Sequence, residues 1–457
     1  MNQLIPGHYV AIFGGAVAGS EAADKLTQRG IRCAVFEQND LPYGKIETGL
    51  PKWHIKLRDS QERKIDQKLR HPLVDFIPNI KLGEDIQFED LARNWGFSAV
   101  LLATGAWRDR PIPVKGIDEF IDNGLYYQNP FVAWFNQKHD PDYKGPQFEI
   151  PDDTIIIGGG LASFDVVKIL VIEQVQLALE RKNIKCDILT IEKLGVPNVL
   201  ENAGLTFKEL GIRGCSLFYR RTVTDMPLTS LPDNPTQHDI ETAHRVRQRI
   251  FDNMQSKYLF QFKECHVPVD IITQKGKLQG LVFRKTEIIN GRVTEIEGSD
   301  FQATAPLVIS AIGSLPESID GVPMNGNVYD VTDPDSGKLN GYEAVFALGN
   351  AVTGRGNIKE SQVHGRKVSE RVMDEFLAWR EEDYEEIFKR AEENAGLKIE
   401  TIGKMLKEKD VLDINQMKRL HNKIRDFQKR VGYQGDYDNW INEHIPVRLE
   451  HLIGYQD

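Results

Sequence analysis

The sequence is poor in cysteine, with four in 457 residues: Cys33, Cys186, Cys215 and Cys265. No two of them form a C-x-x-C pair, and none stands at the spacing of a zinc or iron–sulfur site. This scarcity argues against a redox disulfide and against a cluster-binding module. We expect all four to be buried, unreactive thiols.

Long apolar runs and an excess of positive charge are also missing. The apolar runs are of strand length, too short to span a membrane, and the first leads into a glycine turn rather than a signal-peptide cleavage site. A net charge of -10 argues against general nucleic-acid binding. We therefore expect a cytoplasmic protein of two or three domains, with no nucleic-acid or membrane partner.

What the sequence does contain is a glycine-rich turn near its start. The apolar run "HYVAIF" is typical of a buried parallel strand, and "SEAADKLTQRG" reads as a helix. The residues of the turn form a G-x-A-x-x-G pattern made by Gly14, Gly15, Ala16 and Gly19. Glu37 ends the next strand-like run, where an acid can accept hydrogen bonds from a ribose. The pattern predicts a dinucleotide with its phosphates at the helix N-terminus. The alternative is a glycine turn without a ligand.

A second turn of this kind follows the run "DDTIII". Its pattern is G-x-G-x-x-S, and its candidate binding residues are Gly158, Gly160, Leu161, Ala162 and Ser163. Two such turns predict an α/β protein with two Rossmann-like, doubly wound domains. They also suggest two nucleotides, one held permanently and one exchanged, as in a flavoprotein fed by a nicotinamide cofactor.

Three further strand-like segments end in glycine. They are "FSAVLLATGAWRD" with Thr104 and Gly105, "APLVISAIGSLPE" with Gly313, and "GYEAVFALGN" with Gly349. With these segments the chain resembles the two-dinucleotide-domain flavoprotein reductases, over about residues 8–378. Within them it is most similar to the adrenodoxin-reductase-like ferredoxin–NADP reductases and the small subunit of glutamate synthase.

The resemblance implies that these three strands support an FAD in the first fold. It implies FAD contacts at Gly44, Thr104, Gly105, Gly349, Asn350, Gly356, Asn357 and Ile358, in addition to the first glycine turn and Glu37. Asn350 stands where the family has an acid, and it can still hydrogen-bond a hydroxyl or a phosphate.

The resemblance also implies two candidate catalytic residues. The segment "LPYGKIETGLPKWH" is similar to the family loop beside the isoalloxazine, and His54 matches a histidine near the flavin. Asp165 matches an acid that faces the nicotinamide. From the residues alone, His54 is equally well a core or surface histidine, and Asp165 an acid that stabilises the start of a helix. Neither is needed as an acid–base catalyst, because hydride transfer mainly requires alignment.

The second nucleotide is expected to be NADP(H). The strand-like "GCSLFYRRTVTDMP" ends in Arg220 and Arg221 and is similar to a segment of the glutamate synthase small subunit. A guanidinium matches the geometry of a 2′-phosphate. A rival is Glu192, at the end of the strand-like "CDILTIEK", which would favour NADH. A further alternative is that the two arginines are merely solvated.

The order of the segments predicts that one domain is inserted into the other. We expect an FAD-binding domain of residues 1–106 and 316–378, an NADP-binding domain of residues 107–315, and a helical C-terminal extension of residues 379–457. Charged amphipathic helices are predicted over 380–396, 398–409 and 413–431, either as solvated helices or as a docking module.

These features together predict an NADPH-dependent flavoprotein reductase. Because cluster-binding cysteines are missing, we expect electrons to pass to a ferredoxin-like carrier or a partner subunit. The segment "AHRVRQR" is the candidate docking patch, with His244, Arg245, Arg247 and Arg249, unless it only balances nearby acids. The alternatives are a flavin-dependent monooxygenase or oxidase acting on a small molecule, and an FAD-binding scaffold subunit of a larger complex.

Overall fold

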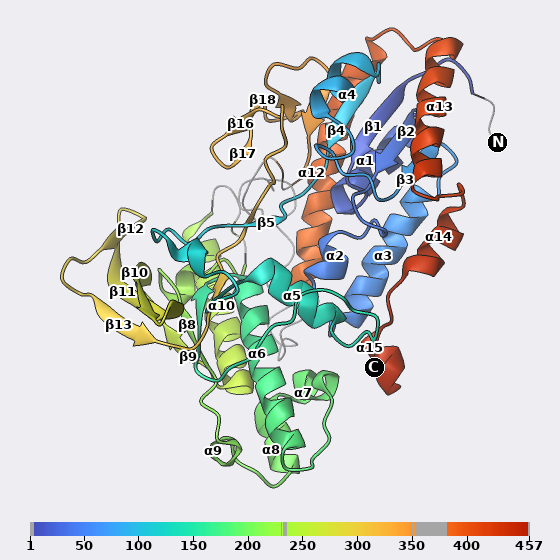
Figure 1. Ribbon diagram of the computed structural model, residues 1–457. Coiled ribbons are helices and arrows are strands. Elements are labelled where there is room, and N and C mark those ends of the chain that lie inside the picture. Colours follow the sequence, from blue (N-terminus) through green and yellow to red (C-terminus); the bar gives the residue numbers. More distant parts are fainter. Residues whose placement is uncertain (1–3, 230, 232–234, 350, 352–381, 456–457) are drawn as a thin grey trace.

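The protein is described by a computed structural model that covers residues 4–229, 231, 235–349, 351 and 382–455. Figure 1 shows two α/β units, one at the upper right and one at the lower left, with the orange helix α12 between them. Each unit is built on its own mainly parallel sheet. The predicted fold class, with two doubly wound units and a helical C-terminal region, is therefore confirmed.

The first sheet has seven strands in the order β18-β19-β20-β4-β1-β2-β3. These are β1 (Tyr9–Phe13), β2 (Arg32–Phe36), β3 (Val74–Ile77), β4 (Ala99–Leu102), β18 (Val331–Asp333), β19 (Lys338–Leu339) and β20 (Val345–Ala347). Strands β20, β4, β1, β2 and β3 run parallel, so their carboxyl ends share one edge. Alternate residues of a strand face opposite sides, and both faces of β1 are wholly buried.

Helices cover both faces of this sheet. Helices α1 (Val17–Thr27) and α3 (Ile55–Leu69) pack with Val10 and Ile12 on one face, whereas α4 (Phe88–Asn94) packs with Tyr9 and Ala11 on the other. The short helix α2 (Lys45–Thr48) lies in the loop after β2.

The C-terminal extension forms α12 (Glu382–Lys407), α13 (Ile414–Arg430), α14 (Tyr437–His444) and α15 (Leu449–Ile453). One continuous helix, α12, replaces the two helices predicted before residue 410. Gly396 does not end it, because this glycine faces α1, where an added Cβ would lie 3.6 Å from Oε1 of Glu21. Ile399 and Ile402 are fully buried against α1, so α12 is part of the core of the first unit rather than a solvated helix.

The second sheet has five parallel strands in the order β6-β14-β7-β8-β9. These are β6 (Leu125–Tyr127), β7 (Thr154–Gly158), β8 (Cys215–Phe218), β9 (Gln261–Lys263) and β14 (Val308–Ala311). The expectation that "APLVISAIGSLPE" supports the FAD of the first fold is wrong, because β14 pairs with β6 and β7. The strand lies within the range 107–315 that was expected to form the second domain. A buried apolar strand fits the interior of either sheet, so its composition does not decide between them.

The helices of the second unit are α5 (Gln128–Gln137), α6 (Leu161–Glu180), α7 (Ile188–Leu194), α8 (Val196–Asn202), α9 (Phe207–Leu210) and α10 (Gln237–Tyr258), with short 3-10 turns η1 (Ile117–Phe120) and η2 (Val223–Asp225). The segment "CDILTIEK" is thus a helix and not a strand. Asp187 starts it, because its carboxylate accepts a 2.9 Å hydrogen bond from the Thr190 N–H. Glu192 therefore does not stand at a strand end.

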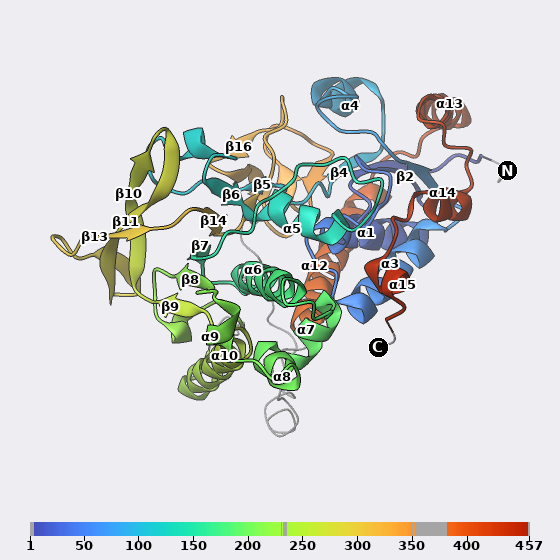
Figure 2. The ribbon, with the colours of Figure 1, turned by 60° about the horizontal axis from the view of Figure 1, so that its bottom comes forward.

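A separate antiparallel sheet projects from the second unit, on the side away from α3 and α15 (Figure 2). Its strands are β10 (His266–Gln274), β11 (Lys277–Ile289), β12 (Arg292–Glu295) and β13 (Phe301–Thr304). The ladder of β5 (Arg108–Asp109) and β15 (Ser314–Leu315) and the hairpin of β16 (Met324–Asn325) and β17 (Val328–Tyr329) complete the strands in the described part of the chain. β5 and β15 lie near the predicted domain crossings, and the domain boundaries themselves stay predictions.

All four cysteines are free thiols. Cys33 and Cys215 are buried as expected, but Cys186 and Cys265 are only half-buried. In the described ranges, no helix is both long and apolar enough to cross a membrane. Nor do the described side chains include a group of three or more that fits a metal ion.

Candidate functional site

The first glycine turn joins β1 to α1 and leaves no room for side chains. Gly14 has φ +101°, and a Cβ there would lie 2.3 Å from the Ala103 carbonyl oxygen. A Cβ on Gly19 would lie 1.8 Å from the carbonyl oxygen of Gly14, so this glycine lets helix and strand pack closely. Both positions therefore require glycine for the backbone path itself.

Ala16 replaces the middle glycine of the fingerprint, and a neighbouring glycine makes space for it. A Cβ on Gly44 would lie 2.9 Å from the Cβ of Ala16. Gly44 has φ +55°, a conformation that glycine adopts without strain. The pair Ala16–Gly44 thus keeps the opening above the turn clear.

Helices α1 and α6 both begin without a capping side chain and without an acid in the first turn. Helices α10 and α13, by contrast, begin with the capping side chains of Thr236 and Asp413. The first N–H groups of a helix lack partners inside it and carry a partial positive charge. The starts of α1 and α6 therefore offer donors to an anionic group.

Glu37, at the end of β2, binds back to the first glycine turn. Its Oε2 accepts a 2.9 Å hydrogen bond from the Gly15 N–H, and its Oε1 accepts bonds from both nitrogens of Asn39. Burial raises the pKa of the Glu37 carboxyl, while these donors oppose the rise. The carboxylate is held beside the turn in one orientation.

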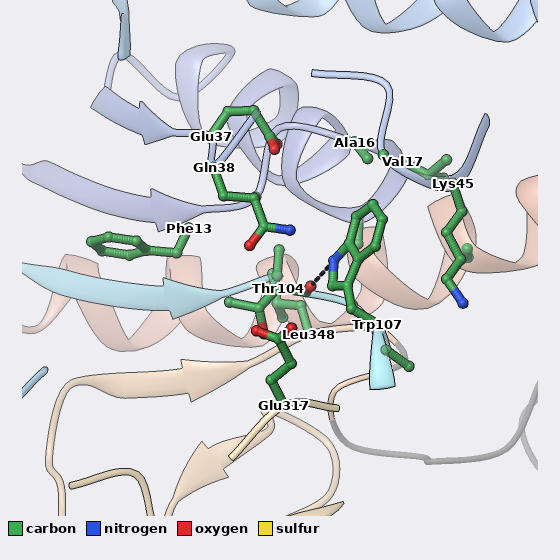
Figure 3. A pocket seen from close by; sticks show the side chains of 18 of the residues that line it. Phe13, Ala16, Val17, Glu37, Gln38, Lys45, Thr104, Trp107, Glu317 and Leu348 are labelled. Atoms are coloured by element: carbon green, nitrogen blue, oxygen red, sulfur yellow. Dashed lines mark hydrogen bonds between the residues drawn. The ribbon is translucent and has the colours of Figure 1, made fainter. Parts of the chain in front are cut away.

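A pocket opens over this turn (Figure 3). It brings together the predicted residues Gly14, Ala16, Glu37, Gly44, Thr104, Gly105 and Gly349. Glu37 and Gln38 lie at one end of the pocket and Lys45 at the other, with the Trp107 indole between them. The indole N–H donates a 2.9 Å hydrogen bond to the Thr104 carbonyl oxygen. The carboxyl ends of β1, β2, β4 and β20 meet here because these strands are parallel neighbours.

Other residues line the pocket that the sequence did not single out: Gln38, Lys45, Trp107, Glu317, Tyr329, Phe388, Asn394 and Lys398. Lys45 and Trp107 lie in segments that carried the resemblance, so the sequence offered a reason to inspect these two residues. Phe388, Asn394 and Lys398 come from α12, and no motif pointed to them. Of the predicted contacts, Asn350, Gly356, Asn357 and Ile358 lie outside the described residues.

Lys45 connects the two units beside this pocket. Its Nζ donates to Asn129 Oδ1 and to Ser314 Oγ, both at 2.9 Å, from α5 and β15. Burial lowers the pKa of Lys45 to about 8, against the attraction of Asp109.

The second glycine turn joins β7 to α6. A Cβ on Gly158 would lie 2.6 Å from the Ala311 carbonyl oxygen, whereas one on Gly160 would meet only Pro227, at 3.8 Å. The backbone at Gly160, ahead of Leu161 and Ala162, is therefore open to a ligand. Ser163 replaces the third glycine and donates its hydroxyl to the Gly160 carbonyl oxygen at 2.6 Å.

Arg220 and Arg221 follow β8, the parallel neighbour of β7. A Cβ on Gly159 would lie 2.1 Å from the ring of Tyr219, so the chain just before the arginines passes directly beside the glycine turn. Arg220 is exposed, and Arg221 donates to the Gly291 carbonyl oxygen at 3.1 Å. Glu192, the rival for the ribose, pairs instead with Lys168, with Nζ and Oε1 2.5 Å apart.

His54 and Asp165 both contact the side chain of Tyr384, at the junction of the two units. His54 precedes α3 and is 5% exposed, and Asp165 lies on α6 and is 2% exposed. Burial, with the nearby charge of Lys168, holds the pKa of His54 well below its usual range. Burial raises the pKa of Asp165 to about 7, while Lys168 and a hydrogen bond from Tyr384 oppose the rise. His54 is therefore neutral at pH 7, and Asp165 titrates near it.

The predicted basic patch on α10 is only partly exposed. Arg245 and Arg249 are exposed and His244 is half-buried. Arg247 is buried, and its guanidinium donates to the carbonyl oxygens of Thr224 and Thr229 at 2.6 and 2.9 Å. The prediction that Arg247 belongs to a docking surface is wrong, because its guanidinium is buried and forms hydrogen bonds within its own chain.

No protein-family model matches the chain. Among curated proteins it is similar to the glutamate synthase (NADPH) small chain of Mycobacterium tuberculosis, at 26% identity over 320 residues. The match covers 68% of this chain, which spans only 54% of that relative. It is also 25% identical over 362 residues to the mitochondrial NADPH:adrenodoxin oxidoreductase of Arabidopsis thaliana, with 70% of each chain covered.

The solved structure of Mycobacterium tuberculosis FprA in complex with NADPH has a similar fold. The TM-score is 0.65 at 18% identity, over 93% of this chain and 91% of that one. This likeness shows a shared fold. The sequence is similar to glutamate synthase small chains and adrenodoxin reductases, so the resemblance that the motifs indicated is confirmed.

Proposed function

We propose that this protein is an FAD-containing oxidoreductase that accepts hydride from NADPH and passes the electrons to a protein partner. One observation carries the proposal: in the parallel part of each of two separate sheets, a strand ends in a glycine turn that leads into an uncapped helix. The similarity to relatives named for NADPH supports the same chemistry. A bound FAD would take hydride from the nicotinamide and release the electrons one at a time.

The first unit is assigned to FAD. Gly14, Gly15, Ala16 and Gly19 would surround the pyrophosphate, with Glu37 directed to the ribose. The other proposed contacts are Gly44, Thr104, Gly105, Gly349, Asn350, Gly356, Asn357 and Ile358. The pocket supports this assignment, because it joins the uncapped start of α1 to the carboxyl ends of parallel strands.

The second unit is assigned to NADP(H). Gly158, Gly160, Leu161, Ala162 and Ser163 would hold the pyrophosphate at the start of α6, and the arginine pair the 2′-phosphate. The position of Glu192 on α7 supports NADPH over NADH. His54 and Asp165 would lie where the two cofactors meet and align the transfer.

We propose a ferredoxin-like carrier or a partner subunit as the electron acceptor. The exposed guanidiniums of Arg245 and Arg249, with His244, are the candidate docking charges on α10. Complementary charge would speed the encounter with an acidic carrier.

The test is steady-state NADPH oxidation by the purified protein, with ferricyanide or oxygen as the acceptor. A reductase of this kind is expected to be yellow, to release about one FAD per chain on denaturation, and to reduce ferricyanide much faster than oxygen. Rapid oxygen consumption would instead indicate a monooxygenase or oxidase. Bound FAD without activity towards either acceptor would indicate a scaffold subunit, and a colourless protein that takes up no FAD would refute the proposal.

A further inference from the structure

A side chain of the C-terminal extension reaches both candidate catalytic residues. Tyr384 lies in the first turn of α12, and its hydroxyl donates a hydrogen bond to Asp165 Oδ2. Its ring stands edge-on to the His54 ring, with centroids 5.1 Å apart and planes at 62°. His54 belongs to the first unit and Asp165 to the second, so one phenol contacts both units. Figure 1 shows the helix that carries it, α12, between the two units.

Two polar atoms remain unpaired at this junction. Asp165 Oδ1 and His54 Nε2 are buried and have no hydrogen-bond partner among the residues that the structure describes. A buried polar atom without a partner is destabilising, and native proteins keep few of them. One carboxylate oxygen and one imidazole nitrogen beside the Tyr384 side chain are therefore available to a polar group of a ligand.

Titratable or charged groups from five elements lie in the surroundings of Asp165, and burial, Lys168, Tyr384 and Glu192 shift its pKa. The titratable or charged groups around it are Lys168 on α6, Glu192 on α7, Tyr258 on α10, His54 ahead of α3 and Tyr384 on α12. Lys168 pairs with Glu192, and its Nζ also lies 4.4 Å from the centroid of the Trp53 ring. Tyr384 is the group that donates directly to the carboxylate, so its hydroxyl stabilises the ionised form.

We propose that Tyr384 is a positioning residue that holds the Asp165 carboxylate in place, and in its ionised form, for hydride transfer between the two units. The proposal rests on the function proposed above. A carboxylate beside a nicotinamide stabilises the positive charge that the ring gains when it gives up hydride. Because α12 packs along α1, it ties Asp165 of the second unit to the first. The C-terminal extension then contributes, through Tyr384, to the site of hydride transfer.

The first test is the infrared titration of Asp165, which needs neither NADPH nor FAD. The C=O stretching band of the protonated Asp165 carboxyl group is identified as the band that disappears in Asp165→Asn. In Tyr384→Phe the pH at which Asp165 is half protonated, the titration midpoint, is expected to rise by about one unit. The reason is that the tyrosine hydroxyl forms a strong hydrogen bond with the ionised carboxylate and only a weak one with the protonated acid. The matched control is Tyr342→Phe, which removes a tyrosine–carboxylate bond to Glu89 in the first unit and leaves the midpoint unchanged.

The second test is the pH profile of NADPH oxidation. With the midpoint moved from about 7 to about 8, the limiting rate at pH 7 is expected to fall about fivefold, while KM for NADPH stays nearly constant. In the Asp165→Asn background, Tyr384→Phe should have no further effect. An unshifted infrared midpoint in folded Tyr384→Phe overturns the link between the two residues. A shifted midpoint in a protein that never oxidises NADPH refutes the proposed function and with it the role in hydride transfer, so the two failures differ.

Discussion

The backbone N–H of Gly15 donates a 2.9 Å hydrogen bond to Oε2 of Glu37, which joins the first glycine turn to the end of the neighbouring strand. Both carboxylate oxygens of Glu37 accept from N–H donors. In Glu37→Gln one oxygen becomes an NH₂ that faces a donor, at a cost of about 1–3 kcal/mol. We expect FAD affinity to fall about tenfold, measured by fluorescence during reconstitution.

Glu84→Gln is the control for that substitution. Glu84 lies in the same unit and its side chain is 69% exposed. Its partner Lys81 lines the pocket but also pairs with Glu317, so the charge of Lys81 stays balanced when Glu84 is exchanged. Its exchange should leave FAD affinity unchanged. Equal affinities for wild type and Glu37→Gln would mean that Glu37 does not shape the cofactor site.

Gly14→Val is expected to abolish FAD retention. The new side chain would collide with the Ala103 carbonyl oxygen and would force a β-branched residue to φ +101°. The control is Gly30→Val, which is also at positive φ (+75°) but has no atom within 4 Å of the new Cβ. Flavin content is measured by absorbance after denaturation, together with circular dichroism. A folded Gly14→Val protein with normal flavin content would show that the pyrophosphate is bound elsewhere.

Arg220→Ala and Arg221→Ala are expected to raise KM for NADPH and to leave KM for NADH nearly unchanged. A charge-assisted hydrogen bond to the 2′-phosphate contributes about 1.5–3 kcal/mol, so each loss should lower kcat/KM for NADPH tenfold or more. NADH has no such phosphate. The measurement is steady-state ferricyanide reduction with each nucleotide, with Arg213→Ala as a control on an arginine whose side chain is 73% exposed. A wild-type preference for NADH, or equal losses with both nucleotides, would contradict the assignment.

Ile402→Ala on α12 is expected to lower the free energy of unfolding by about 2–5 kcal/mol, because a cavity would form in the core against α1. Leu397→Ala on the same helix is the control, since Leu397 is 62% exposed and its loss should change stability by no more than about 0.5 kcal/mol. Urea denaturation followed by circular dichroism measures both. Similar effects for the two variants would mean that α12 does not belong to the core of the first unit.

Local chain chemistry was sufficient to predict the backbone of the two glycine turns. Gly14 and Gly19 are dictated by a backbone path that a side chain would block, and this requirement is visible in the spacing of the glycines. The apolar runs before each turn likewise predicted buried strands, because parallel strands covered on both faces need apolar residues throughout. The two α/β units therefore followed from the sequence.

Tertiary structure alone decided which partners these elements have. The apolar strand Val308–Ala311 suits either sheet, and only its pairing with β6 and β7 assigns it to the second. Arg247 and its neighbour Arg249 have the same chemistry, but one points into the protein and the other to solvent. The contact of Tyr384 with Asp165 joins residues 219 positions apart, and no local pattern encodes such a distance. Spacing along the chain fixes local backbone geometry, whereas burial and long-range contacts depend on how whole elements pack.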